Sequence, residues 1–302
     1  MHFPLSAAPD VRICPSQRKV DRLIMDITVY EFEQLADFIY RKTGIHYEAK
    51  KMYYLSKRIE KRMDSLGIDS SIEYIRFLRY SDADGQELQH FINLITVNET
   101  FFFRDFPQLR SFAEHSLPEV IARKSTGNDN KLRIWSAGCS TGEEPYTLAI
   151  ILKEMLDFSS LWDIEILASD IDLNVLEKAK RAVFSERSIK EVPHEYLEKY
   201  FEPSGSDTYQ LIDDELKEMI RFEHLNLFDK TELRKHRGYD FVFCRNVLIY
   251  FDDASRKEVV DHFYVALNRG GYIYMGSCES AGRITTAFKI KRAGDALVYL
   301  KE

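Results

Sequence analysis

The feature that most constrains this chain is a strand, a small-residue turn and a helix in direct succession between Leu132 and Met155. Residues 132–137 are mostly apolar and are followed by turn residues, as expected of a parallel strand covered on both faces. Gly138 and Gly142 permit unusual dihedral angles and let a ligand approach the backbone. Pro145 suits a first helical turn. The stretch therefore predicts the opening βα unit of a nucleotide-binding α/β sheet.

Two acids in this turn restrict the ligand. A helix N-terminus attracts anions, but Glu143 and Glu144 already bring negative charge to it. Together with the absence of a Gly-x-Gly-x-x-Gly pattern, they disfavour a pyrophosphate and favour a ligand with a cationic group. The alternative is a strand–helix corner whose glutamates only complement the helix dipole. Cys139, in the same turn, is interpreted as a small packing residue.

From Leu132 onward the chain alternates between strand and helix, which predicts a parallel sheet. Further strands are expected at 164–169, 220–224, 239–244 and 272–276, helices at 173–183, 186–201 and 253–268, and a closing antiparallel pair at 288–291 and 296–300. The segment at about 202–220 breaks the rhythm and predicts a small inserted antiparallel β-subdomain. The predicted fold is thus a Rossmann-like α/β domain over residues 131–302.

Polar or glycine residues follow each of the first four predicted strands. They are Gly138, Asp170, Asn226 and Asn246. These residues should meet at the carboxyl edge of the sheet, where open α/β sheets bind ligands. An acid after the second strand can accept hydrogen bonds from ribose hydroxyls, and we assign that role to Asp170, because Asp172 can instead cap the following helix.

The region before this sheet predicts a small helical domain over residues 25–96. Thr28 and Glu31 form a capping box, and apolar stripes mark four short helices at about 28–43, 51–66, 70–78 and 88–95. None of them could bury its stripe alone, so they should pack together. Residues 1–24 contain three prolines without clear periodicity and are interpreted as a flexible extension. Met25 is an alternative start.

One side of the second helix carries four cations, which are Lys57, Arg58, Lys61 and Arg62. Such a face is often merely solvated. Four like charges on two turns repel one another, however, and an anionic partner would relieve that repulsion. Both interpretations remain open from the sequence.

A junction follows at residues 97–130. Three consecutive phenylalanines, 101–103, should pack the two domains together, and a helix is expected at 108–124. Asn98, Thr100 and Arg104 flank these aromatics. Because ligand pockets favour domain junctions, we expect these three side chains to face a ligand.

Composition narrows the class of protein. The net charge of −7 gives no support for nucleic-acid binding. The four cysteines lie far apart, without metal-ligand or disulfide-framework spacing, which favours a reducing cytoplasm. No stretch approaches the ~20 apolar residues of a membrane span. No metal site is expected.

Four motifs together resemble the CheR family, the bacterial chemotaxis receptor methyltransferases. They are NETFFFRD at 98–105, SAGCSTGEEPY at 136–146, ASDID at 168–172 and FCRNVLIYF at 243–251. The resemblance covers about Ile27 to the C-terminus, with the motifs in the family's order. It implies a class I methyltransferase sheet with an N-terminal helical domain, S-adenosylmethionine as methyl donor and S-adenosylhomocysteine as product.

The resemblance also implies site residues. The positions that match the family's cofactor contacts are Asn98, Thr100, Arg104, Glu143, Asp170, Asn226, Leu227, Asn246 and Val247. Arg104 and Tyr250 border the methyl-transfer side and are the predicted catalytic residues. The implied substrates are glutamate side chains on cytoplasmic helices of methyl-accepting chemotaxis receptors, which the basic face at Lys57–Arg62 would meet. A cytoplasmic monomer that does not insert into the membrane is expected.

Two departures from the family pattern concern the C-terminal half. Residues 276–280 read Gly-Ser-Cys-Glu-Ser where many members have Gly-His-Ser-Glu-Ser, so a histidine is missing. The insertion is compact, although some relatives use it to hold a receptor-tail peptide, and this compactness favours tail-independent action. Three rival interpretations are a non-catalytic cofactor-binding regulator, a dinucleotide-dependent oxidoreductase and an interaction module built on the helical domain.

Overall fold

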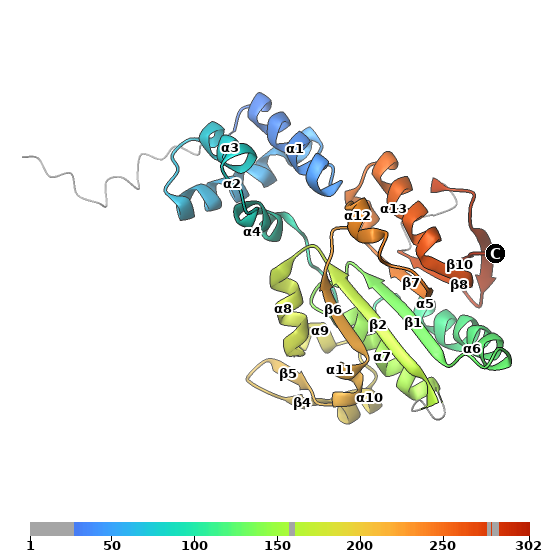
Figure 1. Ribbon diagram of the computed structural model, residues 1–302. Helices are drawn as coiled ribbons and strands as arrows, with labels where there is room; N and C mark the ends of the chain where they lie inside the picture. Colours follow the sequence, from blue (N-terminus) through green and yellow to red (C-terminus); the bar gives the residue numbers. More distant parts are fainter. Residues whose placement is uncertain (1–26, 157–160, 277–278, 280–283) are drawn as a thin grey trace, which may run out of the picture.

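The computed structural model describes residues 27–302 except 157–160, 277–278 and 280–283. A bundle of four helices lies beside one end of the strands of a larger α/β domain (Figure 1). The predicted flexible extension, the alternative start at Met25, and Cys14 and Cys278 lie outside the described residues. No helix in the described ranges combines the length and apolarity that a membrane crossing requires.

The helical domain contains the four predicted helices. They are α1 (Val29–Thr43), α2 (Met52–Leu66), α3 (Ser71–Tyr80) and α4 (Gln86–Ile95), with a 3₁₀ turn η2 (Ala49–Lys51) before α2. The capping box of Thr28 and Glu31 is present, and Gly44 ends α1 in the left-handed conformation with φ 72°. Their apolar stripes meet in one core that includes Leu35, Leu55 and Phe91.

The α/β domain is built on a seven-stranded sheet in the order β6-β2-β1-β7-β8-β10-β9. The strands in that order are β6 (Ile220–His224), β2 (Asp163–Asp170), β1 (Lys131–Ala137), β7 (Tyr239–Cys244), β8 (Leu267–Met275), β10 (Ala296–Leu300) and β9 (Lys289–Ala293). The first five are parallel and the last two pair antiparallel. The predicted sheet is confirmed. β8 begins five residues earlier than expected, because Tyr239 of β7 pairs with Leu267 before a register shift.

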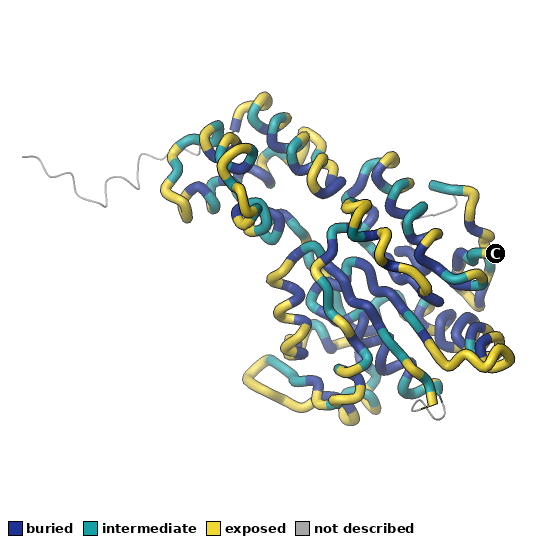
Figure 2. Tube along the Cα trace, in the orientation of Figure 1, coloured by how far each residue is buried: buried dark blue, intermediate teal, exposed yellow. Residues whose placement is uncertain are grey.

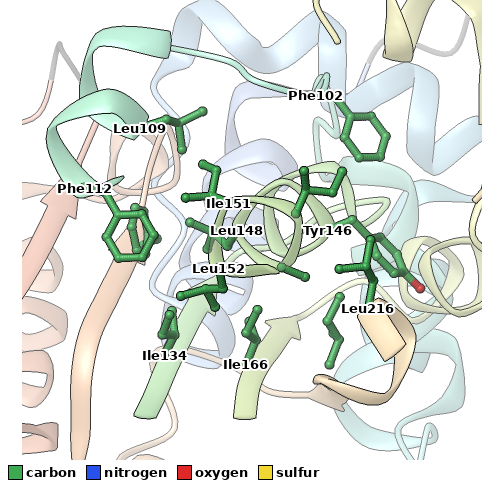
Figure 3. Packing of buried hydrophobic residues seen from close by; sticks show 14 of the residues in the cluster. Phe102, Leu109, Phe112, Ile134, Tyr146, Leu148, Ile151, Leu152, Ile166 and Leu216 are labelled. Carbon is green, nitrogen blue, oxygen red and sulfur yellow. The ribbon is translucent and has the colours of Figure 1, made fainter. Parts of the chain in front are cut away.

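Two layers of helix cover the sheet, as its largely buried central strands require. On one face, α7 (Glu143–Met155) packs Leu148 and Leu152 against Ile134 and Ile166 (Figure 3). On the other face, Trp135 belongs to a second cluster with α12 (Lys230–Leu233) and α13 (Asp253–Ala266). The burial view shows the central strands dark and the outer loops exposed (Figure 2).

The junction helix differs from the expected single helix at 108–124. It runs as α5 (Phe106–Ser111), a π-helical turn η3 (Phe112–Ser116) and α6 (Leu117–Thr126). Within the π turn, Phe112 is fully buried and its ring meets Phe241 and Phe243 edge-on at 4.9 and 5.2 Å between centroids. The junction is thereby fixed to the sheet.

The inserted subdomain is larger than expected. Its three-stranded antiparallel sheet, β3-β5-β4, consists of β3 (Val183–Ser185), β5 (Thr208–Leu211) and β4 (Phe201–Pro203). It therefore starts about twenty residues before the expected 202–220. α8 (Leu173–Arg181) ends at a left-handed Ala182, and the expected helix at 186–201 is split into α9 (Glu186–Ile189) and α10 (His194–Tyr200). A last short helix, α11 (Asp214–Glu218), leads into β6.

Aromatic packing explains why this subdomain reaches back to the junction. The ring of Phe102 lies 4.7 Å from Phe184 and 5.1 Å from Phe201, edge-on in both cases. A single junction residue therefore belongs to the core of the small sheet, a contact that local patterning does not indicate.

The helical domain is joined to the carboxyl edge of the large sheet by main-chain hydrogen bonds. The amide of His46 donates to the carbonyl of Tyr250 at 2.9 Å, and Ile45 forms an isolated bridge with Phe251. The Asn226 side chain donates to the carbonyl of Lys42 at 2.7 Å. The helical domain thus lies directly over the sheet edge where a ligand was expected.

Candidate active site

A cavity of about 260 Å³ lies between the sheet edge, the junction and the helical domain. Gly138, Asp170, Asn226 and Asn246, which end four different strands, all line it, so their predicted convergence is confirmed. The other predicted site residues in its lining are Asn98, Thr100, Arg104, Leu227, Val247 and Tyr250. Glu143 is absent from the lining.

The glycine turn lets two segments approach closely beneath this cavity. Gly138 has φ 81°, and a Cβ there would lie 2.3 Å from Cγ2 of Val247. Gly142 has φ 99° and precedes the first residue of α7. Any side chain at Gly138 would push the Val247 segment away from the sheet.

Asp170 and Asp172 take different roles. Asp170 is 8% exposed and accepts hydrogen bonds from the amides of Ser140, at 2.8 Å, and Asp172, at 3.0 Å. Burial raises the pKa of Asp170 to about 6, against these two hydrogen bonds that lower it. Asp172 caps α8 by accepting from the amide of Asn174, so its predicted capping role is confirmed.

The two glutamates after the turn point in different directions. Glu143 accepts hydrogen bonds from the hydroxyls of Thr141 and Ser188, at 2.6 and 2.9 Å, and is buried on the side of the small subdomain. Glu144 lines the cavity and accepts from the hydroxyl of Ser136 at 2.7 Å. Burial raises the pKa of both carboxyls. The carboxylate that lines this cavity is therefore that of Glu144, whereas the predicted Glu143 lies outside the lining.

The loop after β7 is held in an unusual conformation. Asn246 has φ 61°, and its buried Oδ1 has no hydrogen-bond partner among the described residues. The carboxylate of Glu279 accepts from the amides of Asn246, Ile249 and Gly276 at 3.0, 3.1 and 2.9 Å. Glu279 fixes the loop, which leaves the amide oxygen of Asn246 available to a donor on a ligand.

Several predicted residues shape the cavity wall through contacts within the protein. The side-chain amide of Asn226 donates to the carbonyl of Lys42, and its Oδ1 accepts from the main-chain amide of Phe228 at 2.9 Å. The amide of Asn98 donates to Asp172 at 2.8 Å. Their side chains connect the helical domain and the junction to the sheet edge.

Arg104 and Tyr250 belong to the lining of the same cavity. Nη1 of Arg104 donates to the carbonyl of Glu99 at 2.8 Å, and its guanidinium lies 5.6 Å from the ring centre of Phe101. The hydroxyl of Tyr250 lies 3.5 Å from the carbonyl of Val97. Burial raises the pKa of Tyr250, so its phenol remains a hydrogen-bond donor at neutral pH.

Sequence reasoning missed Arg245, which follows β7 and lines the cavity. Its side chain is 4% exposed and contacts the carboxylates of Glu144 and Asp105 at 3.2 and 3.1 Å. It lies inside the 243–251 motif, where only its neighbours were singled out. An arginine directly after a buried strand was the available signal. Cys139, by contrast, is buried with its thiol pKa raised by burial, which fits a packing role.

The basic face of α2 is less uniform than predicted. Arg62 is turned inward and forms two hydrogen bonds with Glu87, at 2.9 and 2.6 Å, so it is already neutralised. Lys57 pairs with Glu60 at 3.1 Å, and the guanidinium of Arg58 lies 3.6 Å above the ring of Tyr54. Lys61 is exposed.

Comparison with known proteins gives a consistent result. The family model described as "CheR methyltransferase, SAM binding domain" matches residues 98–296, and "CheR methyltransferase, all-alpha domain" matches residues 30–96. Chemotaxis protein methyltransferase 2 of Vibrio cholerae is 42% identical over 275 residues, which cover 91% of this chain and 94% of the relative. The chemotaxis protein methyltransferases of Borreliella burgdorferi and Escherichia coli are 33% and 32% identical, covering 85% and 86% of this chain and 90% and 87% of theirs.

Proposed function

Because this chain belongs to the CheR methyltransferase family and carries its SAM-binding domain, we propose that it methylates glutamate side chains of chemoreceptors. The observation that carries the proposal is the cavity itself, whose lining combines the acids Asp170 and Glu144 with Arg104 and Tyr250. When bound, S-adenosylmethionine supplies a methyl group on a positively charged sulfur. The product would be a glutamate methyl ester, with S-adenosylhomocysteine released.

The acidic wall fits such a donor. The carboxylate of Asp170 is placed to accept from ribose hydroxyls, and that of Glu144 can pair with an ammonium group. The buried Oδ1 of Asn246 lacks a partner among the described residues, so it can accept from another donor on the ligand. No group of three His, Cys, Asp or Glu side chains suited to hold a metal occurs in the described part of the chain.

The other part of the lining, with Arg104 and Tyr250, suits a carboxylate acceptor. A glutamate is already ionised near pH 7, so no general base is needed. Arg104 can orient the incoming carboxylate through its charge, and the neutral phenol of Tyr250 can donate a hydrogen bond to it. Catalysis then rests on positioning the acceptor and on partly removing its water.

The basic face on α2, apart from Arg62, is proposed to dock the acidic receptor helices in the cytoplasm. Arg58 and Lys61 are the residues that we assign to this contact, with Lys57 beside them. Arg62 is left out, because its charge is satisfied inside the domain by Glu87.

The test is transfer of label from methyl-labelled S-adenosylmethionine to membranes that contain chemoreceptors. Incorporated label should leave as methanol on mild alkali, as an ester does and a methylamine does not. Tyr250→Phe should lower the transfer while S-adenosylhomocysteine still binds, and Arg104→Gln should lower the transfer more than it lowers that affinity, because Arg104 is also a predicted cofactor contact. Alkali-stable label would contradict the ester assignment.

The rival functions predict other outcomes. A non-catalytic regulator would bind S-adenosylmethionine without transferring label. A dinucleotide-dependent oxidoreductase would bind nicotinamide cofactors in calorimetry, and an interaction module would bind neither. The acids of the cavity disfavour the pyrophosphate that the second rival requires.

A further inference from the structure

Arg245 connects Glu144 with the junction segment that carries Arg104, and all three residues line the cavity. Its Nη1 donates to Glu144 on the cofactor side at 3.2 Å. Its Nη2 donates to the main-chain carbonyl of Arg104 and, at 3.1 Å, to the carboxylate of Asp105. One guanidinium therefore holds a carboxylate of α7 and the backbone of the junction at the same time.

The backbone that Arg245 holds is strained. Phe103 and Asp105, which flank Arg104, both have φ 56°, a left-handed conformation that non-glycine residues rarely adopt. Such a conformation persists only where the surroundings enforce it. The amide of Phe103 donates to the hydroxyl of Thr147 at 3.2 Å, and Arg245 donates to the carbonyl of Arg104. Without these contacts, the segment that carries Arg104 would relax.

The carboxylate of Glu144 depends on the same guanidinium. The groups that face it are Arg245 and Arg104, the hydroxyl of Ser136 and the buried thiols of Cys139 and Cys244. Both thiols have a pKa raised by burial and carry no charge near neutrality. Arg245 is the cation in direct contact with Glu144, so its removal leaves a largely buried carboxylate with less compensation.

We propose that Arg245 is a positioning residue for methyl transfer, which fixes the main chain of Arg104 relative to the carboxylate of Glu144. This inference rests on the proposed function, in which Arg104 orients the acceptor carboxylate and Glu144 pairs with the ammonium group of the methyl donor. A planar guanidinium can satisfy three acceptors in different directions. A lysine retains the charge but not this geometry.

The placement of Arg104 and the charge compensation of Glu144 are tested by different variants of Arg245. Arg245→Lys keeps a cation beside Glu144, so affinity for S-adenosylhomocysteine should stay within about threefold, while kcat for receptor methylation falls at least about thirtyfold because Arg104 is misplaced. Arg245→Met removes the charge. Its affinity for S-adenosylhomocysteine should fall about tenfold at pH 6 and recover as the pH rises, because the pKa of Glu144 increases.

Matched controls separate positioning from stability. Arg133 of β1 pairs with Asp163 at 2.7 Å, outside the residues that line the cavity. Arg133→Lys and Arg133→Met should leave kcat and the pH profile of binding unchanged, whatever they do to the melting temperature. In Arg245→Met/Glu144→Gln the added pH dependence should disappear, because the titrating group is gone.

Calorimetry between pH 5.5 and 8 measures the affinity for S-adenosylhomocysteine. Kinetics with receptor membranes measure kcat for methylation. All variants are compared well below their own melting temperatures. Wild-type kcat in Arg245→Lys would overturn the positioning of Arg104. An unchanged pH profile in Arg245→Met would overturn the coupling to Glu144. The binding arm does not need a receptor, so a failure of the proposed substrate, seen as no methylation by the wild type, is distinguishable from a failure of this inference.

Discussion

The cavity and the basic face of α2 were both predicted from the sequence, and they differ in how closely the structure follows the pattern. In the cavity, four residues at the ends of four strands meet. On α2, four cations at helical spacing do not act as one surface, because Arg62 pairs with Glu87 inside the domain. Strand ends in a parallel sheet share one edge by topology, whereas a long helical side chain can turn towards a partner far away in the sequence.

The largest expected effect is a loss of stability when Arg62 is replaced. It would show that Arg62 serves the fold, unlike the other cations of α2. Arg62→Met leaves Glu87, which is 5% exposed, and the hydroxyl of Tyr74 without their cation. Breaking a buried pair by removing one partner costs about 3 kcal/mol of unfolding free energy or more. Urea or thermal unfolding measures the loss, while affinity for S-adenosylhomocysteine should remain unchanged.

Two controls complete this experiment. Lys61→Met on the same helix should change the unfolding free energy by less than about 0.5 kcal/mol. In Arg62→Met/Glu87→Leu, which removes both charges, much of the stability should return. If Arg62→Met were as stable as the wild type, Arg62 would belong to the docking surface after all.

The next effect concerns the cavity. Asp170→Ala removes the acceptor for the amides of Ser140 and Asp172 and for the predicted ribose hydroxyls. We expect affinity for S-adenosylhomocysteine, measured by calorimetry, to fall about 100-fold, or roughly 3 kcal/mol. Asp213→Ala, which likewise removes a carboxylate that accepts a main-chain amide hydrogen bond but lies outside the cavity lining, should leave that affinity intact. Equal effects of both variants would mean that Asp170 only supports the fold.

These particulars show how far the sequence could be interpreted. The order of strands and the edge at which Asp170 and Asn246 meet follow from strand–helix alternation. The choice between Glu143 and Glu144 does not, because adjacent helical residues point about 100° apart and the packing of Ser188 decides which one is turned away. Arg245 was missed because its partners, Glu144 and Asp105, come from other elements. The contact of Phe102 with Phe184 of the small sheet was missed for the same reason.

A third prediction tests whether the basic face of α2 docks the receptor. The double charge reversal Arg58→Glu/Lys61→Glu should raise the KM for receptor membranes at least about tenfold, because it replaces attraction by repulsion at the proposed interface. The effect should shrink at high salt. Affinity for S-adenosylhomocysteine should stay at the wild-type value. Lys178→Glu/Lys180→Glu on α8 is the matched control, and an equal loss of methylation in both would indicate a general charge effect.

The pH dependence of S-adenosylhomocysteine binding tests the role of Asp170 in the cavity. The pKa of Asp170, about 6, lies above its usual value because of burial, so below pH 6 the unliganded carboxyl is mostly protonated and accepts hydrogen bonds poorly. Affinity for S-adenosylhomocysteine should therefore rise by up to about tenfold between pH 5 and 7.5. Asp170→Asn, which cannot titrate, should lose the component of this rise centred near pH 6. A flat profile in the wild type would contradict the proposed role of the ionised carboxylate.

The smallest expected effect is that of a receptor-tail peptide, and it tests whether α2 docks the receptor without help from the small subdomain. The edge strands β3 and β4 have three residues each, and β4 ends in Pro203, which has no amide hydrogen to donate. A peptide strand added to either edge could form only a few main-chain hydrogen bonds. We expect no binding of the tail peptide at concentrations up to roughly 100 μM, and no change in methylation of receptors that lack the tail. Micromolar binding by calorimetry would instead make the subdomain a second docking surface, and the effect of the Arg58→Glu/Lys61→Glu reversal should then be weaker on receptors that carry the tail.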